Sequence, residues 1–399
     1  MPTTFMHTGD EHIDSDIHGS INPKTGLNTA WESNYRVVRF LAETAAERKV
    51  DFFLSAGDNF KTGRPSQEAL LLFVDALEPL AKAGIPIILL DGNHHLTGVA
   101  SDHRTVIHVV AEMLRARGGT VHIASDPKLI TLEGGQQIAA LPWLSKNRIL
   151  NALEATDLTP AAGDARVAEY AMQVLDKMAT EADSGQPLIM ASHVTIDDFK
   201  IDAVAEGFTR GSEMELAHLF SEPVLPRKGL ELLPFSYGAL SHIHTPQHLG
   251  KRFWYAGSPN KLTFTDMKDQ KAGNLVTIDD DGVATVELIF TPARVMTSLD
   301  LETSDWDTKL SGLEAGTLVQ VVLETGNPEV PRDLRKAIAD AGAILADTKP
   351  RAKPREVKEH VVLPQTTDHM AALRTWAAHN APETVDVEHL VAAAENLES

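Results

Sequence analysis

Eight side chains of the types that bind metal ions stand in five short groups along the sequence. They are Asp10 and His12, Asp58, Asn93 and His94, His193, and His242 and His244. Carboxylate, imidazole and amide groups, in a chain without cysteine, suit manganese, iron or zinc better than calcium. Two cations about 3.5–4 Å apart need a shared ligand, and a carboxylate such as Asp58 can bridge them. The groups therefore predict a two-metal site.

The charges of such a site favour an anionic substrate. Two divalent cations bring +4, Asp10 and Asp58 bring −2, and a bridging hydroxide brings −1, which leaves +1 at the site. A phosphate group can therefore bind there although the whole chain has a formal charge of −20.

Two of the groups share a spacing of two residues, Asp10 with His12 and His242 with His244. In extended backbone, residues at this spacing project to the same face, so both members can turn toward one point. Each motif alone is common by chance, and a single histidine such as His193 is more often a hydrogen-bonded core residue than a ligand. An ordered set of ligand types is hard to obtain from a structural core, so we interpret the set as one site.

Each group follows an apolar run that we predict to be a buried β-strand. The runs cover residues 3–8, 50–56, 85–90, 188–191 and 237–240. Residues with helical periodicity lie between the first runs, at 31–45 and at 70–80, and the second helix is expected to be capped by Ser66 and to end at Gly84. This alternation predicts a layered α/β domain with its ligands at the carboxyl ends of the strands.

Composition limits the class of protein. The chain has 399 residues, enough for two or three domains, and 43% of them are hydrophobic. Its acidic balance argues against a protein that coats nucleic acid by bulk charge. The lack of cysteine excludes disulfides, thiolate metal sites and cysteine nucleophiles. We see no membrane-spanning run and no secretory signal, so we expect a cytoplasmic protein.

Four segments are expected along the chain. Residues 1–292 form the large domain, which ends in a hairpin of strands 275–278 and 283–290. Residues 293–348 form a small α+β domain with strands at 318–323 and 344–346 and a helix at 331–341. Residues 349–360 form a basic linker, and residues 361–399 form a tail of two short amphipathic helices. We favour the interpretation that the basic run at 349–355 is a solvated linker. The alternative is that it contacts DNA or a partner.

The order D-x-H, G-D, G-N-H, a lone His and H-x-H resembles that of the calcineurin-like metallophosphoesterase superfamily. The segments 192–195 and 255–264 match more closely its DNA-repair nuclease branch, SbcD and its archaeal and eukaryotic relatives. The resemblance covers residues 1–292. It implies a layered metallophosphoesterase β-sandwich flanked by helices, with a small α+β cap domain and a short C-terminal helical tail.

The resemblance also implies roles for the eight side chains. One metal ion would be held by Asp10, His12, Asp58 and His244, and the second by Asp58, Asn93, His193 and His242. His94 would face the scissile phosphate, where it stabilises charge or protonates the leaving oxygen. The implied ions are Mn²⁺, with Mg²⁺ as the alternative, and the implied reaction is hydrolysis of DNA phosphodiesters.

The same resemblance implies partners. They are DNA, an SbcC-type coiled-coil ABC ATPase that would bind the helical tail, and a second copy of the chain in a homodimer. Lys61, Arg64 and Lys261 are the candidate DNA contacts, with a solvated surface lysine as the alternative for Lys61.

Three departures from the family pattern bear on the mechanism. His95 stands where the family has Asp or Glu, a carboxylate that can orient the preceding imidazole, so the role of His94 depends on what His95 does. Lys61 stands where relatives often have His or Asp. Ser192 and Ser241 replace Gly, which is acceptable where the backbone has an ordinary φ.

Two other functions fit the same residues. The first is a metal-dependent phosphomonoesterase or cyclic-nucleotide phosphodiesterase, although such enzymes tend to lack a cap and tail. The second is a scaffold that binds DNA ends and an ATPase with weak or no cleavage, a hypothesis motivated by Lys61 and His95.

Overall fold

The computed structural model describes residues 2–96, 104–199, 222–302, 306–324 and 329–351, and also Arg374, Ala377, Val387 and Glu388. The chain divides into two units, Met1–Pro350 and Arg351–Ser399. Most of the predicted linker and nearly all of the predicted helical tail lie outside the described residues, so both stay predictions. Within the described ranges, no helix is long and apolar enough to cross a membrane.

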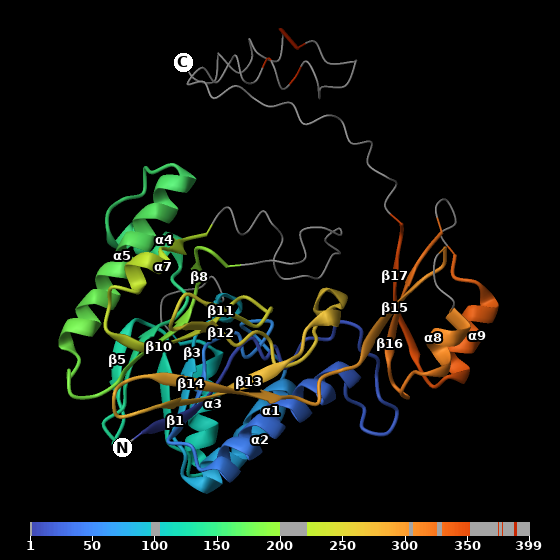
Figure 1. Ribbon diagram of the computed structural model, residues 1–399, viewed down its shortest axis with the longest axis horizontal. Helices are drawn as coiled ribbons and strands as arrows, with labels where there is room; N and C mark the ends of the chain where they lie inside the picture. Colours follow the sequence, from blue (N-terminus) through green and yellow to red (C-terminus); the bar gives the residue numbers. More distant parts are fainter. Residues whose placement is uncertain are drawn as a thin grey trace. The chain divides into compact units, whose positions relative to one another are not determined.

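Two six-stranded sheets form the centre of the unit Met1–Pro350 (Figure 1). The first sheet has the order β14-β13-β1-β2-β3-β4. Its strands β1 to β4 are parallel, β13 pairs antiparallel with β1, and β14 pairs antiparallel with β13. Its strands are β1 (Thr3–Thr8), β2 (Phe52–Ser55), β3 (Ile87–Leu90), β4 (Val121–Ala124), β13 (Ala272–Ile278) and β14 (Ala284–Phe290). The predicted strands of this sheet are confirmed, with their ends shifted by a few residues.

The second sheet also has six strands, in the order β11-β12-β10-β7-β6-β5. Its four central strands are parallel and its two edge strands are antiparallel. They are β5 (Lys128–Thr131), β6 (Gln137–Leu141), β7 (Leu188–His193), β10 (Phe235–Ser241), β11 (Gln247–Leu249) and β12 (Phe253–Tyr255). Strands β7 and β10 run two and one residues further than predicted, so His193 itself ends a strand. A short parallel pair, β8 (Thr195–Ile196) and β9 (Val224–Leu225), comes between β7 and β10 in the sequence.

Side chains alternate between the two faces of each buried strand, so both faces of each sheet are apolar and both are covered. The layers are, in order, helices, the first sheet, the second sheet and helices. Phe52 and Leu54 of β2 face the core between the two sheets, where Phe5 stacks on Phe52 with ring centroids 4.6 Å apart, and Phe53 faces outward. The outer face of the first sheet packs on α1 (Thr29–Arg48), α2 (Gln67–Ala83) and α3 (Val106–Ala116). The outer face of the second packs on α5 (Pro160–Glu181) and on Leu230 of the short helix α7 (Arg227–Leu230), and α4 (Lys146–Ala152) contacts α5. The predicted β-sandwich flanked by helices is confirmed (Figure 1).

The ends of α2 follow from local sequence. The Ser66 side chain accepts a hydrogen bond from Ala69 N, and Gly84 ends the helix with φ of 70°. Both were predicted, since a capping hydroxyl and a left-handed C-terminal glycine satisfy helix-end groups that otherwise lack partners.

The described residues between 296 and 349 include a small parallel sheet with its own apolar core. The order is β15-β16-β17, and the core includes Leu299, Val321 and Leu334. The elements are β15 (Met296–Asp300), α8 (Trp306–Ser311), β16 (Leu318–Val322), α9 (Arg332–Asp340) and β17 (Ile344–Lys349). Strand β15 and helix α8 were not predicted. The boundary of this segment as a separate cap domain stays a prediction.

Candidate metal centre

The loops that follow β1 and β2 are joined by backbone hydrogen bonds. Asp10 N donates to Gly57 O at 2.9 Å, and His12 N donates to Asp58 O at 3.1 Å. The φ angles of Asp10, His12 and Asp58 are 52°, 39° and 52°, a region that costs an L residue roughly 1–2 kcal/mol. The prediction that Asp10 and His12 converge on extended backbone was therefore wrong. They converge because a left-handed turn, held by the neighbouring loop, redirects both side chains.

The loop after β10 also has a residue with positive φ that is held by a neighbouring loop. His242 has φ of 99°, and its backbone N donates to both carboxylate oxygens of Asp10, at 2.9 and 3.2 Å. The extended backbone expected for the pair of His242 and His244 is therefore also wrong. Ser192 and Ser241 are not among the residues with positive φ, which explains why serine is acceptable at both positions.

Six of the predicted ligands form two compact clusters. The ligand atoms of Asp10, His12 and His244 all lie within 4.8 Å of one another, and so do those of Asp58, His193 and His242. In each cluster at least two of the three residues are buried. The ring of His12 lies 5.2 Å from that of His244, and the ring of His193 lies 5.1 Å from that of His242. Four of the five groups of the sequence thus meet at one edge of the two sheets.

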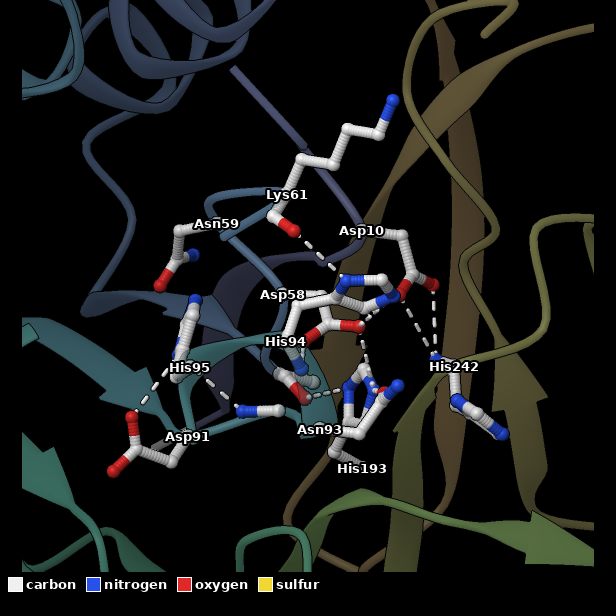
Figure 2. A network of polar contacts seen from close by, with 12 residues as sticks. Asp10, Asp58, Asn59, Lys61, Asp91, Asn93, His94, His95, His193 and His242 are labelled. Carbon is white, nitrogen blue, oxygen red and sulfur yellow. Dashed lines mark hydrogen bonds and ion pairs between the residues drawn. The ribbon is translucent and has the colours of Figure 1, made fainter. Parts of the chain in front are cut away.

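Asn93 completes the second cluster (Figure 2). His193 Nε2 lies 3.0 Å from Asn93 Oδ1 and 3.1 Å from Asp58 Oδ2. Ligand atoms bound at about 2.0–2.2 Å to one cation lie about 3–3.5 Å apart. These oxygen and nitrogen atoms therefore fit a divalent metal ion. The other ring nitrogen of His193 lies 3.2 Å from Ala56 O and fixes the ring.

Two glycines leave room for these ligands. A Cβ on Gly57, whose φ is 119°, would collide with Nδ1 of His193, and a Cβ on Gly92 would collide with Oδ1 of Asp58. The glycine that precedes each ligand in the G-D and G-N-H motifs is thus a requirement of close packing.

The surroundings of the second cluster keep its carboxylate ionised, which is the state a metal ligand needs. Burial alone would raise the pKa of Asp58, but the adjacent His193, followed by His12 and His94, holds that pKa far below its usual range. Burial likewise opposes protonation of His242, yet its contact with Glu222 raises its pKa. Asp58 is thus a carboxylate that neighbouring positive charge stabilises, as a metal ligand should be.

His94 lies beside the clusters. One of its ring nitrogens faces the Lys61 carbonyl and the other faces Asp58. Its Nδ1 lies 2.9 Å from Lys61 O, and its Nε2 lies 3.9 Å from Asp58 Oδ2. Its backbone N donates to Asp58 Oδ1 at 3.0 Å, and 25% of its side chain is exposed. Because the Lys61 carbonyl accepts a hydrogen bond from Nδ1, Nε2 is the nitrogen directed toward Asp58.

The backbone carbonyl of His244 is held by hydrogen bonds from residues whose role sequence reasoning missed. Its carbonyl accepts hydrogen bonds from Ser258 N at 3.1 Å and from Lys271 Nζ at 2.9 Å. Gly257, with φ of 72°, allows this approach, because a Cβ there would lie 2.6 Å from the same oxygen. Lys271 is fully buried and also pairs with Asp266 and Asp269. Gly257 and Ser258, within the segment 255–264 noted from the sequence, therefore support a ligand residue.

Glu222 is a second residue that sequence reasoning missed. Its two carboxylate oxygens each lie 3.2 Å from His242 Nε2, and Oε1 accepts a hydrogen bond from the Thr195 hydroxyl. The ring of Trp143 lies 5.1 Å from that of His242. No motif or periodicity in the sequence marks Glu222, because it reaches the cluster only through the fold.

The three candidate DNA contacts differ in their surroundings. Lys61 Nζ lies 3.6 Å from an Asp16 carboxylate oxygen, and Lys261 Nζ donates to Met267 O at 2.8 Å. Arg64 is exposed. Their roles in DNA binding stay predictions.

Comparison with known proteins agrees with these features. The family model described as calcineurin-like phosphoesterase matches residues 3–230. SbcD, a subunit of the SbcCD nuclease, from Escherichia coli K12 is 26% identical over 302 residues, which cover 72% of this chain and 68% of that protein. DNA double-strand break repair protein Mre11 of Methanopyrus kandleri is 23% identical over 376 residues, or 89% of this chain and 72% of that protein. The corresponding SbcCD nuclease subunit of Staphylococcus epidermidis is 22% identical over 313 residues, or 76% and 73%.

Proposed function

The chain belongs to the calcineurin-like phosphoesterase family, which hydrolyses phosphoesters with two divalent metal ions, and we propose that it is a manganese-dependent DNA nuclease. The observation that carries the proposal is a pair of ligand clusters at one edge of the two sheets, one of Asp10, His12 and His244 and the other of Asp58, His193 and His242. The excess positive charge of such a centre suits a phosphodiester. The similarity to proteins named as SbcCD nuclease subunits and Mre11 supports DNA as the substrate.

We assign the ligands as the family resemblance implies. Asp10, His12, Asp58 and His244 would hold one ion, and Asp58, Asn93, His193 and His242 the other, with Asp58 shared. When bound, the ions would activate a water molecule and neutralise the charge of the phosphate. When its ring is protonated on both nitrogens, His94 would direct the N–H of Nε2 to the same space, where it would stabilise charge on the phosphate or protonate the leaving oxygen.

We also propose that the protein is the nuclease subunit of a complex with an SbcC-type coiled-coil ABC ATPase, acts in DNA repair or recombination, and forms a homodimer. The support is the similarity to relatives named as subunits of SbcCD. The proposed docking segment for the ATPase is the predicted tail, residues 361–399.

Replacement of the shared ligand tests the proposal. We expect Asp58→Ala to abolish Mn²⁺-dependent cleavage of linear duplex DNA and to remove binding of at least one of two Mn²⁺ ions measured by calorimetry. Asp75→Asn is a matched control, because Asp75 is an acidic residue that pairs with Arg117 and belongs to none of the ligand motifs. Cleavage that persists in Asp58→Ala would reject the assignment.

The choice of substrate separates the proposal from its alternatives. The wild-type protein should cleave duplex DNA faster than a chromogenic phosphomonoester or a cyclic nucleotide, each assayed with Mn²⁺. The reverse order would identify a phosphomonoesterase or a cyclic-nucleotide phosphodiesterase. Binding of two Mn²⁺ ions and of DNA ends without cleavage of any substrate would identify a scaffold.

A further inference from the structure

His95 lies in a buried network that does not include the metal ligand clusters. Its side chain is fully buried, and its Nδ1 lies 3.0 Å from Asp91 Oδ1. The other oxygen of Asp91 accepts the Thr105 hydroxyl at 2.9 Å. A carboxylate accepts hydrogen bonds, so Nδ1 of His95 carries the ring proton. The N–H of Gly92 is farther from this nitrogen, at 3.4 Å, and does not change the assignment.

The opposite side of the His95 ring holds the loop that follows Asp58. With the proton on Nδ1, Nε2 is an acceptor, and Phe60 N lies 3.4 Å from it. The next residue along the chain is Lys61, whose carbonyl is 2.9 Å from Nδ1 of His94. His95 therefore fixes the backbone immediately before the carbonyl that orients His94.

The adjacent imidazoles thus act on opposite sides of the same loop. Figure 2 shows His95 turned toward Asp91 and His94 turned toward Asp58 and the carbonyl of Lys61. The two rings do not need to touch, because the backbone at Phe60 and Lys61 connects them. Asp14, which accepts Lys61 N at 2.6 Å, anchors this loop from another side.

We propose that the Asp91–His95 pair is a positioning element, which holds the Lys61 carbonyl in place and thereby sets the orientation and the ring-proton position of His94. The effect on catalysis rests on the proposed nuclease function. The effect on His94 does not. The pair would take the place of the carboxylate that the family has after Gly-Asn-His, through a different route.

The two members of the pair depend on each other. A carboxylate at position 95 would face the Asp91 carboxylate in a buried space, and like charges there repel strongly. We therefore expect His95→Asp to lower the melting temperature, and the double variant with Asp91→Asn to regain most of that loss. A double variant no more stable than His95→Asp would overturn the pairing.

The kinetic test compares His95→Ala with His95→Gln. Glutamine can reach the position of Nε2 and accept the Phe60 N–H, whereas alanine cannot. In the Mn²⁺-loaded protein we expect His95→Ala to lower kcat on duplex DNA by about tenfold to a hundredfold, with KM and Mn²⁺ stoichiometry unchanged. His95→Gln should regain most of kcat. A purely structural role would instead lower melting temperature and metal uptake in both variants without separating their kcat values, and that result would overturn the proposal.

A spectrum of the metal-free protein tests the positioning without any assay of activity. Long-range ¹H–¹⁵N correlations report which ring nitrogen of a histidine carries the proton. In the wild type we expect the proton of His94 on Nδ1, directed at Lys61 O. His95→Ala should give a mixture of the two tautomers, and His122→Ala, which removes a partly buried histidine of β4, should not. An unchanged His94 signal in His95→Ala would overturn the proposal even if the protein cleaves DNA. A changed signal in a protein without nuclease activity would support it and reject only the nuclease.

Discussion

Asp58 Oδ2 lies 3.1 Å from Nε2 of His193, although the two residues come from different sheets. Asp58 follows β2 in the first sheet, and His193 ends β7 in the second. The second ligand cluster therefore exists only where the carboxyl edges of both sheets meet. Its assembly depends on how closely the loop after β2 approaches His193, and Gly57 controls that approach.

Gly57→Ala should disturb this contact. The new Cβ would collide with the His193 ring at a φ of 119°, so we expect a loss of about 2–4 kcal/mol in the free energy of unfolding. Mn²⁺ affinity measured by calorimetry should also fall. Gly118→Ala is the control, because Gly118 has φ of 85° with no atom near the added Cβ, and it should lose only about 1–2 kcal/mol. Equal losses in urea denaturation of both variants would contradict the contact.

Local features of the fold could be predicted from the sequence. The Ser66 cap, the Gly84 helix end and the hairpin with Ile278 opposite Ala284 each depend on a few neighbouring residues. The ligand types and their order along the chain were also predictable, because each group follows a strand. The left-handed backbone at Asp10 and His12 was not, since it is held by the loop of another strand.

Residues that contact the site only through long-range packing could not be identified from the sequence. Glu222 reaches His242, and Lys271 reaches the carbonyl of His244, across chain separations of 20 and 27 residues. His95 was recognised as a departure, but its partner Asp91 could be identified only from the packed structure. These contacts depend on long-range packing, which spacing within a motif does not specify.

A buried histidine between the sheets should make stability depend on pH. Burial lowers the pKa of His7 to about 3, and its Nδ1 lies 3.0 Å from the Tyr237 hydroxyl. The folded state therefore excludes a proton that the unfolded chain binds below about pH 6.5. This contribution to stability is full above pH 6.5 and is lost progressively as pH falls toward 3.

His7→Phe should remove that contribution. Between pH 7.5 and pH 5, the metal-free wild type should lose about 2 kcal/mol more of its free energy of unfolding than the variant loses. Urea denaturation at the two pH values measures the difference. His248→Phe, at an exposed position of β11, should keep the wild-type dependence on pH. A parallel loss in wild type and His7→Phe would show that His7 is not the group responsible.

Lys271→Met should destabilise the protein strongly. The change leaves Asp266 and Asp269 without their cation and removes a donor from His244 O, which we expect to cost about 3–5 kcal/mol. The double variant with Asp266→Asn should be more stable than Lys271→Met alone, because one unpaired buried charge is gone. Lys261→Met, which loses a single carbonyl contact of a partly buried lysine, is the control and should cost less than about 1 kcal/mol. Chemical denaturation that ranks the double variant lowest would contradict this ion-pair network.

Among the candidate DNA contacts, Arg64 should contribute most to binding. Lys61 Nζ is near the Asp16 carboxylate, and Lys261 Nζ donates to Met267 O, so each would have to give up part of a protein contact to bind phosphate. Arg64→Ala should weaken binding to duplex DNA and reduce the slope of log K against log salt by about one. Titration of fluorescent DNA at several salt concentrations measures both, with equal melting temperatures as the control for folding. An unchanged salt dependence in Arg64→Ala, together with a clear reduction in Lys261→Ala, would show that Lys261 and not Arg64 is the main phosphate contact.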